Sequence, residues 1–250
     1  DLHSFPTRRS SDLHIAANAP VVCALGGISA HRRAGHADDA WWPGTVGEGL
    51  ALDTRRWRLL AFDYLGGCGE TSGPGDDAKW PSVSTFDQAD CILRLLNHLG
   101  IKVLRALVGA SYGAMVALAF GERYPERVSR LVIVSGADRA HPLATAWRGV
   151  QREIVRLAAE CGRSAEGLKI ARALAMSTYR SGEEFAARFA GAPREVDSTF
   201  RFPSEEYVLA RGEEWAARQR PQPFLRLSES LDLHRVDYME IGRASCRERV

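Results

Sequence analysis

The chain has 250 residues, of which 45% are hydrophobic and 26% are charged, and its formal net charge is +2. These values suit one globular domain with room for an inserted cap. No basic block indicates binding to nucleic acid or to a membrane surface. No apolar run approaches the roughly 20 residues that a membrane-spanning helix requires, so we expect neither nucleic acid nor a membrane as a partner.

The cysteines and histidines point to a protein with reduced thiols and without a metal. Five cysteines are scattered along the sequence without a C-x-x-C pair, and the N-terminus has no apolar core typical of a signal peptide. We therefore expect a cytoplasmic protein. His31 and His36 have no acidic or cysteine partner at metal-ligand spacing, so no metal site is predicted.

The two ends of the chain read as translations of one oligonucleotide. Back-translation of residues 3–13 gives a DNA strand whose reverse complement encodes residues 240–250. This oligonucleotide is similar to a sequencing-library adapter, so we exclude residues 1–13 and 240–250 from reasoning about the fold. We expect the natural segment to run from about residue 14 to residue 239 and to be truncated at both ends.

The first buried strand is expected at residues 20–25, where an apolar run enters a glycine-rich loop. In a serine acyl-transfer fold such a loop supplies a backbone N–H to the oxyanion hole. An ordinary turn between a strand and a helix is the alternative. The adjacent Trp41 and Trp42 in the following loop are expected to pack over the core or over the floor of a pocket.

A second buried strand is expected at residues 57–64, followed by a loop rich in glycine, proline and aspartate. Apolar residues then recur close to the 3.6-residue period, which predicts an amphipathic helix over residues 86–99. Ser84 or Thr85 is the expected N-cap of this helix, and Gly100 is the expected stop.

Residues 105–124 organise the rest of the chain. The apolar run 106–108 enters G-A-S-Y-G at 109–113, and a helix-like run follows at once. This is the G-x-S-x-G pattern of a nucleophile elbow, a strained turn that lifts the serine clear of the sheet. Ser111 is therefore the candidate nucleophile, at the N-terminus of a helix that favours negative charge. A glycine-rich turn with an idle serine is the alternative.

A further apolar strand is expected at residues 128–135. Strands thus alternate with helices over residues 14–139, which predicts an α/β protein with a mostly parallel sheet and right-handed crossovers. Ligands of such sheets bind beyond the carboxyl ends of the strands. Both the glycine-rich loop and Ser111 are predicted to lie at that edge.

After Gly136 the pattern becomes helical, with one weak strand signal near residues 196–202. Residues 140–239 are therefore interpreted as a helical cap inserted in the sheet. Arg180 stands at a helix end in this cap and is suited to hold a substrate carboxylate through two hydrogen bonds. A plain surface arginine is the alternative. The expected helices cover residues 142–161, 165–178, 183–189 and 204–218.

Several motifs in register resemble the MetX-type homoserine O-acyltransferases of the α/β-hydrolase superfamily. They include the Trp41-Trp42 pair, L-G-G-C at 65–68, G-A-S-Y-G-A-M at 109–115 and T-Y-R-S at 178–181. The resemblance covers nearly all of residues 20–239. It implies an α/β-hydrolase fold, a mostly parallel sheet flanked by helices, that carries a helical cap.

The resemblance also implies roles for individual residues. Ser111 would accept the acyl group, the backbone N–H groups of Leu25 and Tyr112 would form the oxyanion hole, and Arg180 would bind the amino-acid carboxylate. The implied substrates are L-homoserine and an acyl-CoA, either acetyl-CoA or succinyl-CoA. The implied reaction is a ping-pong acyl transfer of methionine biosynthesis, without a bound cofactor, in a protein that forms a homodimer.

The triad acid and base of this family follow the cap, and the chain ends before both. The resemblance therefore implies that the segment lacks them and is inactive as written. Asp232 and His234 occur in the order expected of a triad, but they lie only two residues apart. A triad aspartate and histidine sit on separate loops so that the imidazole bridges acid and serine, so we do not assign these two residues.

Three other functions stay open at this point. The first is a true hydrolase, such as an esterase, peptidase or lactonase, on the same fold. The second is acyl transfer to serine in place of homoserine. The third is a non-catalytic module that binds acyl-CoA or homoserine. Ester turnover without an acceptor, a comparison of the two acceptors, or binding without release of CoA would distinguish them.

Overall fold

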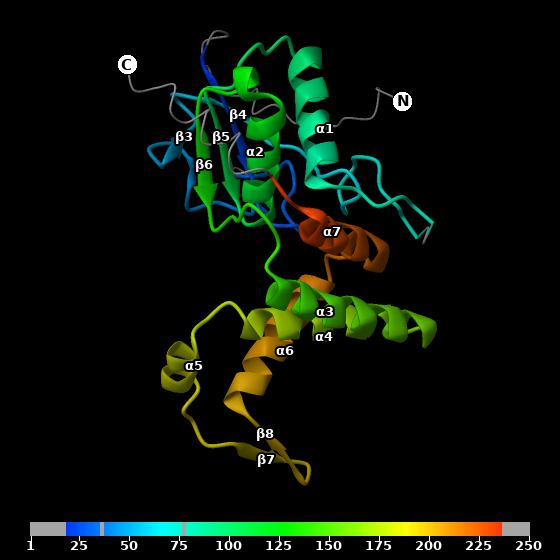
Figure 1. Cartoon of the computed structure of the whole chain (residues 1–250). Coiled ribbons are helices and arrows are strands. Elements are labelled where there is room, and N and C mark those ends of the chain that lie inside the picture. The colour runs from blue at the N-terminus through cyan, green and yellow to red at the C-terminus, as the bar shows by residue number, and fades with distance from the viewer. Residues whose placement is uncertain (1–18, 36–37, 77–78, 237–250) are drawn as a thin grey trace. The chain divides into compact units, whose positions relative to one another are not determined.

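The computed structural model describes residues 19–35, 38–76 and 79–236 of the chain (Figure 1). The two segments interpreted as adapter lie outside the described residues. The chain divides into two compact units. The first, called the α/β unit, comprises the described residues up to Ala140 and from Arg226 onward. The second, called the helical unit, comprises His141–Leu225.

The α/β unit is built on a four-stranded sheet in the order β4-β1-β5-β6, and all its described strand pairs are parallel. In its register Cys23 pairs with Leu60 on one side and with Leu107 on the other. The predicted α/β fold with a parallel sheet is therefore confirmed. The strands are β1 (Val21–Leu25), β4 (Arg58–Leu60), β5 (Ala106–Ala110) and β6 (Leu131–Val134).

Burial along these strands follows their place in the sheet. All five residues of the central β1 are buried, whereas most of the edge strand β6 is exposed. The ladders of β4 and β6 are shorter than the apolar runs that predicted them. After β4 the chain leaves the ladder, yet Ala61, Phe62 and Tyr64 stay buried. The apolar run at residues 57–64 therefore reflects burial as well as pairing.

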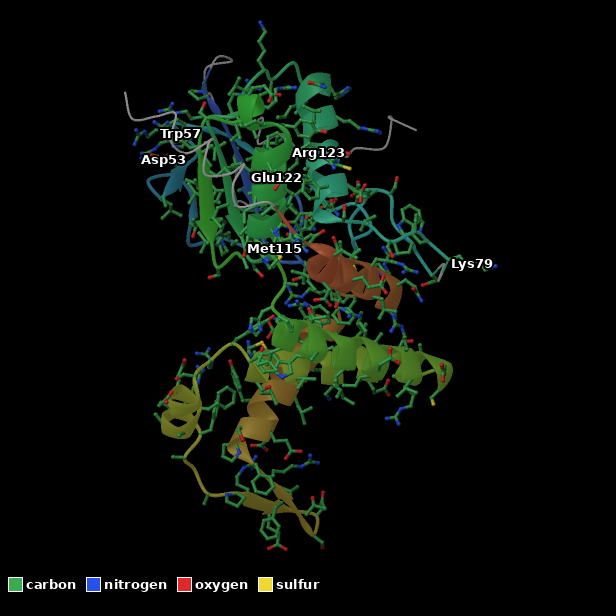
Figure 2. The ribbon with its side chains drawn as sticks, viewed as in Figure 1. Asp53, Trp57, Lys79, Met115, Glu122 and Arg123 are labelled. Atoms are coloured by element: carbon green, nitrogen blue, oxygen red, sulfur yellow. The ribbon has the colours of Figure 1, made fainter. Side chains whose placement is uncertain are left out.

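Two helices, α1 (Thr85–His98) and α2 (Tyr112–Arg123), lie side by side along the sheet (Figure 1). Ser84 begins α1 with a capping box: its hydroxyl accepts from the N–H of Asp87, whose carboxylate accepts from the N–H of Ser84. This arrangement satisfies two of the orphan donors at the helix start. Figure 2 shows Met115 near the beginning of α2 and Arg123 near its end.

The main core fills the space between the sheet and these two helices. The side chains that line this core are apolar. Most residues of α2 are buried in it, and small alanines alternate along the helix with larger side chains. A 3₁₀ turn, η1 (Pro125–Arg127), follows α2. Fully buried members of the core include Ile92, Leu95, Leu96, Leu107, Val116 and Phe120.

A second, smaller core holds the two tryptophans. Their rings stack with centroids 5.1 Å apart, and they pack against Ala34, Val46 and Ala61. Trp41 Nε1 donates a hydrogen bond of 2.7 Å to the His31 carbonyl. The short parallel pair β2 (Val46–Gly47) and β3 (Leu52–Asp53) completes this region.

The helical unit is organised around α4, which packs against both α3 and α6. A Cβ added to Gly167 would stand 2.5 Å from the Ala158 Cβ, and one added to Gly212 would stand 2.4 Å from the Lys169 carbonyl oxygen. Glycine at these two positions therefore allows the helix backbones to approach closely. The helices are α3 (Pro142–Glu160), α4 (Ser164–Ser177), α5 (Gly182–Arg188) and α6 (Pro203–Ala216).

Two features of this region go beyond the sequence-based expectations. The weak strand signal is a hairpin of β7 (Arg194–Val196) and β8 (Thr199–Arg201), closed by two residues with positive φ. A further helix, α7 (Pro221–Leu233), follows α6 and continues into the α/β unit. None of the described helices is long and apolar enough to cross a bilayer.

Candidate active site

Ser111 occupies the sharp turn between β5 and α2. Its φ of 56° and ψ of −118° lie in a region that costs a non-glycine residue about 1–3 kcal/mol. Its side chain makes no capping hydrogen bond to α2. Ser111 is exposed, whereas Val108 before it and Tyr112 after it are buried. The turn therefore presents the hydroxyl at the carboxyl edge of the sheet.

A backbone hydrogen bond and two glycines, which have no side chains, stabilise this turn. The N–H of Ser111 donates to the Val134 carbonyl at 2.9 Å. A Cβ on Gly109 would stand 2.2 Å from the Gly113 carbonyl oxygen, and a Cβ on Gly113 would stand 2.5 Å from the Leu25 carbonyl oxygen. Both contacts are with backbone atoms, which cannot move aside cheaply. The two glycines are therefore a steric requirement of the strained serine.

The two predicted oxyanion-hole residues lie at the same edge. Leu25 is the last residue of β1, and Tyr112 is the first residue of α2, where N–H groups lack acceptors within the helix. The next residue after Leu25, Gly26, accepts two hydrogen bonds of 2.8 Å, from Gly113 N–H and from the Tyr64 hydroxyl. These bonds fix the end of β1 against the start of α2.

A buried carboxylate holds the other end of the loop that leaves β1. Asp63 Oδ1 accepts from the N–H of Arg32 at 2.9 Å, and Oδ2 accepts from Arg32 Nη1 at 3.1 Å. Oδ2 also accepts from the N–H of Glu70 at 3.0 Å. The Glu70 carboxylate binds Arg32 as well, and this contact raises the pKa of the arginine. Asp63 and Tyr64 thus hold residues 26–32 at both ends.

Sequence reasoning did not assign a role to Asp63 or Tyr64. The available signal was a polar pair, D-Y, at the end of a buried run and directly before a glycine-rich turn. The phenol of Tyr64 packs edge-on against Tyr112 with ring centroids 4.9 Å apart. The Tyr112 hydroxyl lies 2.7 Å from Ser230 Oγ, and burial raises the pKa of both phenols. Both rings are therefore buried and pack beside the site.

His234 is buried, and both nitrogens of its ring have hydrogen-bond partners within the fold. Its Nδ1 lies 2.8 Å from Thr85 Oγ1, and its Nε2 lies 3.0 Å from the Ala137 carbonyl oxygen. A carbonyl only accepts, so Nε2 carries the proton and Nδ1 accepts from the threonine in the neutral ring. Burial lowers the pKa of this histidine. Within the described residues, Ser111 Oγ has no hydrogen-bond partner.

Arg180 belongs to the helical unit, between α4 and α5. Its Nη1 pairs with Glu184, and its Nη2 donates to the Tyr207 hydroxyl at 3.4 Å. The guanidinium carbon stands 6.0 Å from the centre of the Tyr207 ring. The hydrogen bonds to Tyr207 and Glu184 raise the pKa of Arg180. The side chain that the sequence selected as a carboxylate ligand is thus already bound to a carboxylate.

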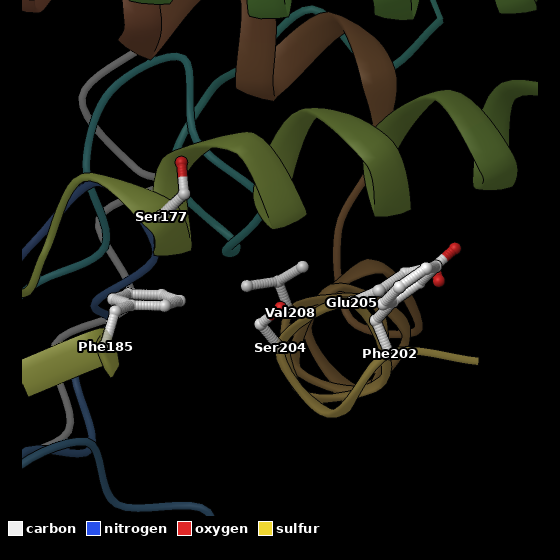
Figure 3. Close-up of a pocket in the computed structure, with 6 residues that line it drawn as sticks. All are labelled: Ser177, Phe185, Phe202, Ser204, Glu205 and Val208. Carbon is white, nitrogen blue, oxygen red and sulfur yellow. The ribbon is translucent and has the colours of Figure 1, made fainter. Parts of the chain in front are cut away.

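A hollow of about 570 Å³ opens in the helical unit (Figure 3). Its walls are largely apolar, with Phe185, Phe202 and Val208 facing it, and Arg180 is not among its lining residues. The remaining lining residues are Ser177, Ser204 and Glu205. Among the described residues no group of three His, Cys, Asp or Glu side chains is placed to hold a metal ion.

The fold and the elbow together define a class of protein. An exposed, strained serine stands between a parallel strand and a buried helix, next to a glycine-rich loop from the neighbouring strand. This is the arrangement of the α/β-hydrolases. Residues 20–234 match the family described as "alpha/beta hydrolase fold", and the chain belongs to that family.

Within this family the chain resembles acyltransferases of amino acids. It is 46% identical over 226 residues to a homoserine O-succinyltransferase of Xanthomonas campestris pv. campestris, an alignment that covers 89% of this chain and 59% of the relative. It is 33% identical over 239 residues to a serine O-succinyltransferase of Emericella nidulans, which covers 85% of this chain and 46% of that relative. The chain thus spans about half the length of these relatives. The resemblance to homoserine O-acyltransferases is confirmed.

The fold also matches a solved structure, that of the homoserine O-acetyltransferase from Bacillus anthracis. The TM-score is 0.76 at 19% sequence identity, and the match covers 87% of this chain and 67% of the other. At this identity the likeness concerns the fold.

Proposed function

We propose that the parent protein of this chain is an acyl-CoA-dependent homoserine O-acyltransferase of methionine biosynthesis. The observation that carries the proposal is the 46% identity to a homoserine O-succinyltransferase, which extends over 226 residues and includes the Ser111 elbow. The fold by itself would not suffice, because one fold hosts many unrelated chemistries.

In the proposed reaction Ser111 Oγ attacks the thioester carbonyl of the acyl-CoA. A base takes the serine proton, the acyl–serine ester bond forms, the C–S bond breaks, and CoA leaves with a proton. The backbone N–H groups of Leu25 and Tyr112 stabilise the tetrahedral oxyanion. The homoserine hydroxyl then attacks the acyl–serine ester, and Ser111 is restored. Arg180 binds the homoserine carboxylate in place of Glu184.

We also propose that the chain as written is inactive, because the base and acid of the triad are not part of it. His234 supports this view, since both of its ring nitrogens already have partners. A serine without its base is a weak nucleophile, and loss of triad members costs orders of magnitude in rate. The alignments cover 59% and 46% of the two relatives, whose remaining parts leave room for the missing groups.

Serine is the second candidate acceptor, because the chain is 33% identical to a serine O-succinyltransferase. Both acetyl-CoA and succinyl-CoA are proposed as donors. The test is to express the natural open reading frame that contains residues 14–239 and to follow the release of the CoA thiol. Each donor is paired with homoserine, with serine and with water alone. The proposal expects turnover that depends on an amino acid and is abolished in Ser111→Ala. Equal turnover without an acceptor would identify a hydrolase instead.

Two further properties complete the proposal. None of the described cysteines forms a disulfide, which supports a cytoplasmic location. Exposed Phe200 and Phe202 and the apolar hollow in the helical unit support a homodimer formed through this unit. Light scattering on the purified protein tests the oligomeric state, and a monomer at all concentrations would contradict the homodimer.

A further inference from the structure

Trp41 contacts the loop that leaves β1 at two points. At the first, its six-membered ring stands against the Cα of Gly26, since a Cβ added to this glycine would lie 2.7 Å from both Cε3 and Cζ3 of the ring. At the second, its Nε1 donates a hydrogen bond of 2.7 Å to the His31 carbonyl. One side chain therefore contacts both the beginning and the end of the loop at residues 26–31.

Between these two contacts the loop forms a tight turn. The N–H of Ala30 donates to the Gly27 carbonyl at 2.9 Å, and a Cβ on Gly26 would stand 2.6 Å from the Ala30 Cβ. Gly26 is thus enclosed between this turn and the Trp41 ring. Because close-packed atoms do not approach one another so closely, a residue with a side chain at position 26 would displace either the ring or the loop.

Trp41 is itself held in place by the second, smaller core. Its ring stacks on that of Trp42 with centroids 5.1 Å apart and an interplanar angle of 20°. The backbone N–H of Trp41 donates to the Arg33 carbonyl at 3.3 Å, and that of Trp42 donates to the Ala34 carbonyl at 3.0 Å. Both rings pack against this core. Trp41 therefore connects the loop after β1 to a separate packed cluster.

The position of this loop bears on catalysis because Gly26 follows Leu25 directly. Leu25 is the last residue of β1, so the sheet fixes it on one side and the loop fixes it on the other. A donor of an oxyanion hole acts at about 2.7–3.1 Å from the oxyanion. A displacement of about 1 Å can cost about 100-fold in rate. A residue that fixes Gly26 therefore also determines where the Leu25 N–H points.

We propose that Trp41 is a positioning residue for the oxyanion hole. Its ring holds Gly26 and its indole N–H holds His31, so the loop keeps one conformation and the Leu25 N–H keeps its direction. This inference rests on the proposed function in one respect only, namely that the Leu25 N–H stabilises an oxyanion formed at Ser111. Transfer to homoserine and hydrolysis of an ester both require that step.

The test uses the parent protein, expressed from the natural open reading frame that contains residues 14–239, with the substitution Trp41→Phe. Phenylalanine keeps an aromatic ring for the stack and loses the N–H that binds His31. We expect kcat to fall by about tenfold or more. KM should change by less than about twofold, because the oxyanion is absent from the ground state.

Trp42→Phe is the matched control. It changes the other ring of the same stack and leaves the hydrogen bond from Trp41 to His31 in place. Its kcat should therefore stay within about twofold of that of the unsubstituted protein. Circular dichroism and Tm establish that both variants are folded, and the two should lose a similar amount of stability.

A boronic acid distinguishes a positioning role from a general loss of structure. Propylboronic acid binds covalently to a catalytic serine and forms a tetrahedral adduct, in which an oxygen on boron takes the place of the oxyanion. Its inhibition constant should rise in Trp41→Phe by about the same factor as kcat falls, since both depend on the oxyanion hole. In Trp42→Phe the inhibition constant should not change.

Gly26→Ala disturbs the same contact from the other side, because its Cβ meets the Trp41 ring. We expect kcat to fall in this variant as well. The double variant Gly26→Ala/Trp41→Phe should have a kcat close to that of the slower single variant, because one contact is lost only once. If the two losses multiply, the residues act independently and the proposal is wrong.

Each variant is assayed with acyl-CoA and homoserine and, separately, with p-nitrophenyl acetate in water. If homoserine accepts no acyl group but Trp41→Phe still slows ester turnover, the proposed function fails and the positioning role stands. If homoserine is acylated at an unchanged kcat in Trp41→Phe, the positioning role fails and the proposed function stands. Equal losses of kcat in Trp41→Phe and Trp42→Phe, or the lack of any turnover that depends on Ser111, would also overturn the positioning role.

Discussion

The α/β unit and the helical unit are stabilised in different ways. In the α/β unit a continuous apolar core lies under the site, and the backbone at Ser111 is fixed by contacts between main-chain atoms. In the helical unit most side chains are at least partly exposed, and arginines pair with glutamates or stack on aromatic rings. Apolar burial contributes far more to stability than exposed ion pairs do.

This difference suits the two tasks of the proposed acyltransferase. A strained nucleophile requires a rigid support, because its geometry persists only where the surroundings determine it. The proposed role of the helical unit in substrate binding tolerates exchangeable contacts, since in that proposal the Arg180–Glu184 pair opens to admit another carboxylate. We therefore expect substitutions to be costly at the elbow and mild in the helical unit.

The largest effect is expected from Gly113→Ala. The new Cβ would stand 2.5 Å from the backbone of Leu25, so the chain must shift or stay strained. We expect a loss of unfolding free energy on the order of 3 kcal/mol, measured by urea denaturation. The control is Gly149→Ala in α3, where a Cβ meets nothing within 4 Å. There alanine should stabilise the helix by about 0.5–1 kcal/mol. Similar losses at both glycines would contradict the contrast.

A smaller effect is expected from Tyr64→Phe, which removes the buried hydrogen bond to Gly26. The expected loss of stability is about 1 kcal/mol, and in the parent enzyme kcat should fall because the end of β1 loosens. Tyr124→Phe is the matched control, since it removes a hydroxyl bond to Asp90 at the far end of α2. It should reduce stability without reducing kcat. Equal losses of kcat in both variants would show that Tyr64 acts on stability alone.

His234 should add a pH dependence to the stability of the α/β unit. Its pKa in the folded chain is lowered below 6.5 by burial, so the unfolded chain takes up the proton first as the pH falls. The unfolding free energy should therefore be highest above pH 6.5 and decrease below it. His234→Gln should remove this component of the slope, whereas substitution of the exposed His98 should not. An unchanged slope in His234→Gln would refute the assignment.

The smallest effect is expected at an ion pair of the helical unit. Lys169 Nζ and Glu213 Oε2 lie 2.5 Å apart, and the glutamate side chain is 69% exposed. Because such pairs are screened by water, Glu213→Gln should change the unfolding free energy by less than about 1 kcal/mol. Melting curves at low and high salt test this, and the difference from the unsubstituted chain should shrink at high salt. A loss as large as that of Gly113→Ala would overturn the contrast.

The sequence predicted those parts of the structure that local patterns determine. The 3.6-residue period and the cap residue predicted α1 to within one residue at each end, and the glycine spacing predicted the turn at Ser111. Helix α7 was not predicted from the sequence, because Pro221 and Pro223 in its first turn are typical of a break. The first turn of a helix nevertheless tolerates proline. The length of β4 was overestimated, because buried residues such as 61–64 form the same apolar run in a sequence as the residues of a paired strand.

Contacts between segments that are distant in the chain could not be predicted from the sequence. Nothing local shows that Asp63 meets Arg32 or that His234 meets Thr85, since these pairs are separated by many residues and depend on the packed fold. The same holds for Arg180. Motif resemblance selected it, whereas only the structure shows that Glu184 and Tyr207 occupy its terminal nitrogens.

The central claim is that Ser111 carries the acyl group during the reaction. The most direct test is to mix the parent protein with succinyl-CoA or acetyl-CoA in the absence of an amino acid and to analyse its peptides by mass spectrometry. The account predicts one acyl group on the peptide that contains Ser111, its absence in Ser111→Ala, and its loss when homoserine is added. Transfer of the acyl group to homoserine without any labelled serine, or with Ser111→Ala fully active, would contradict the account.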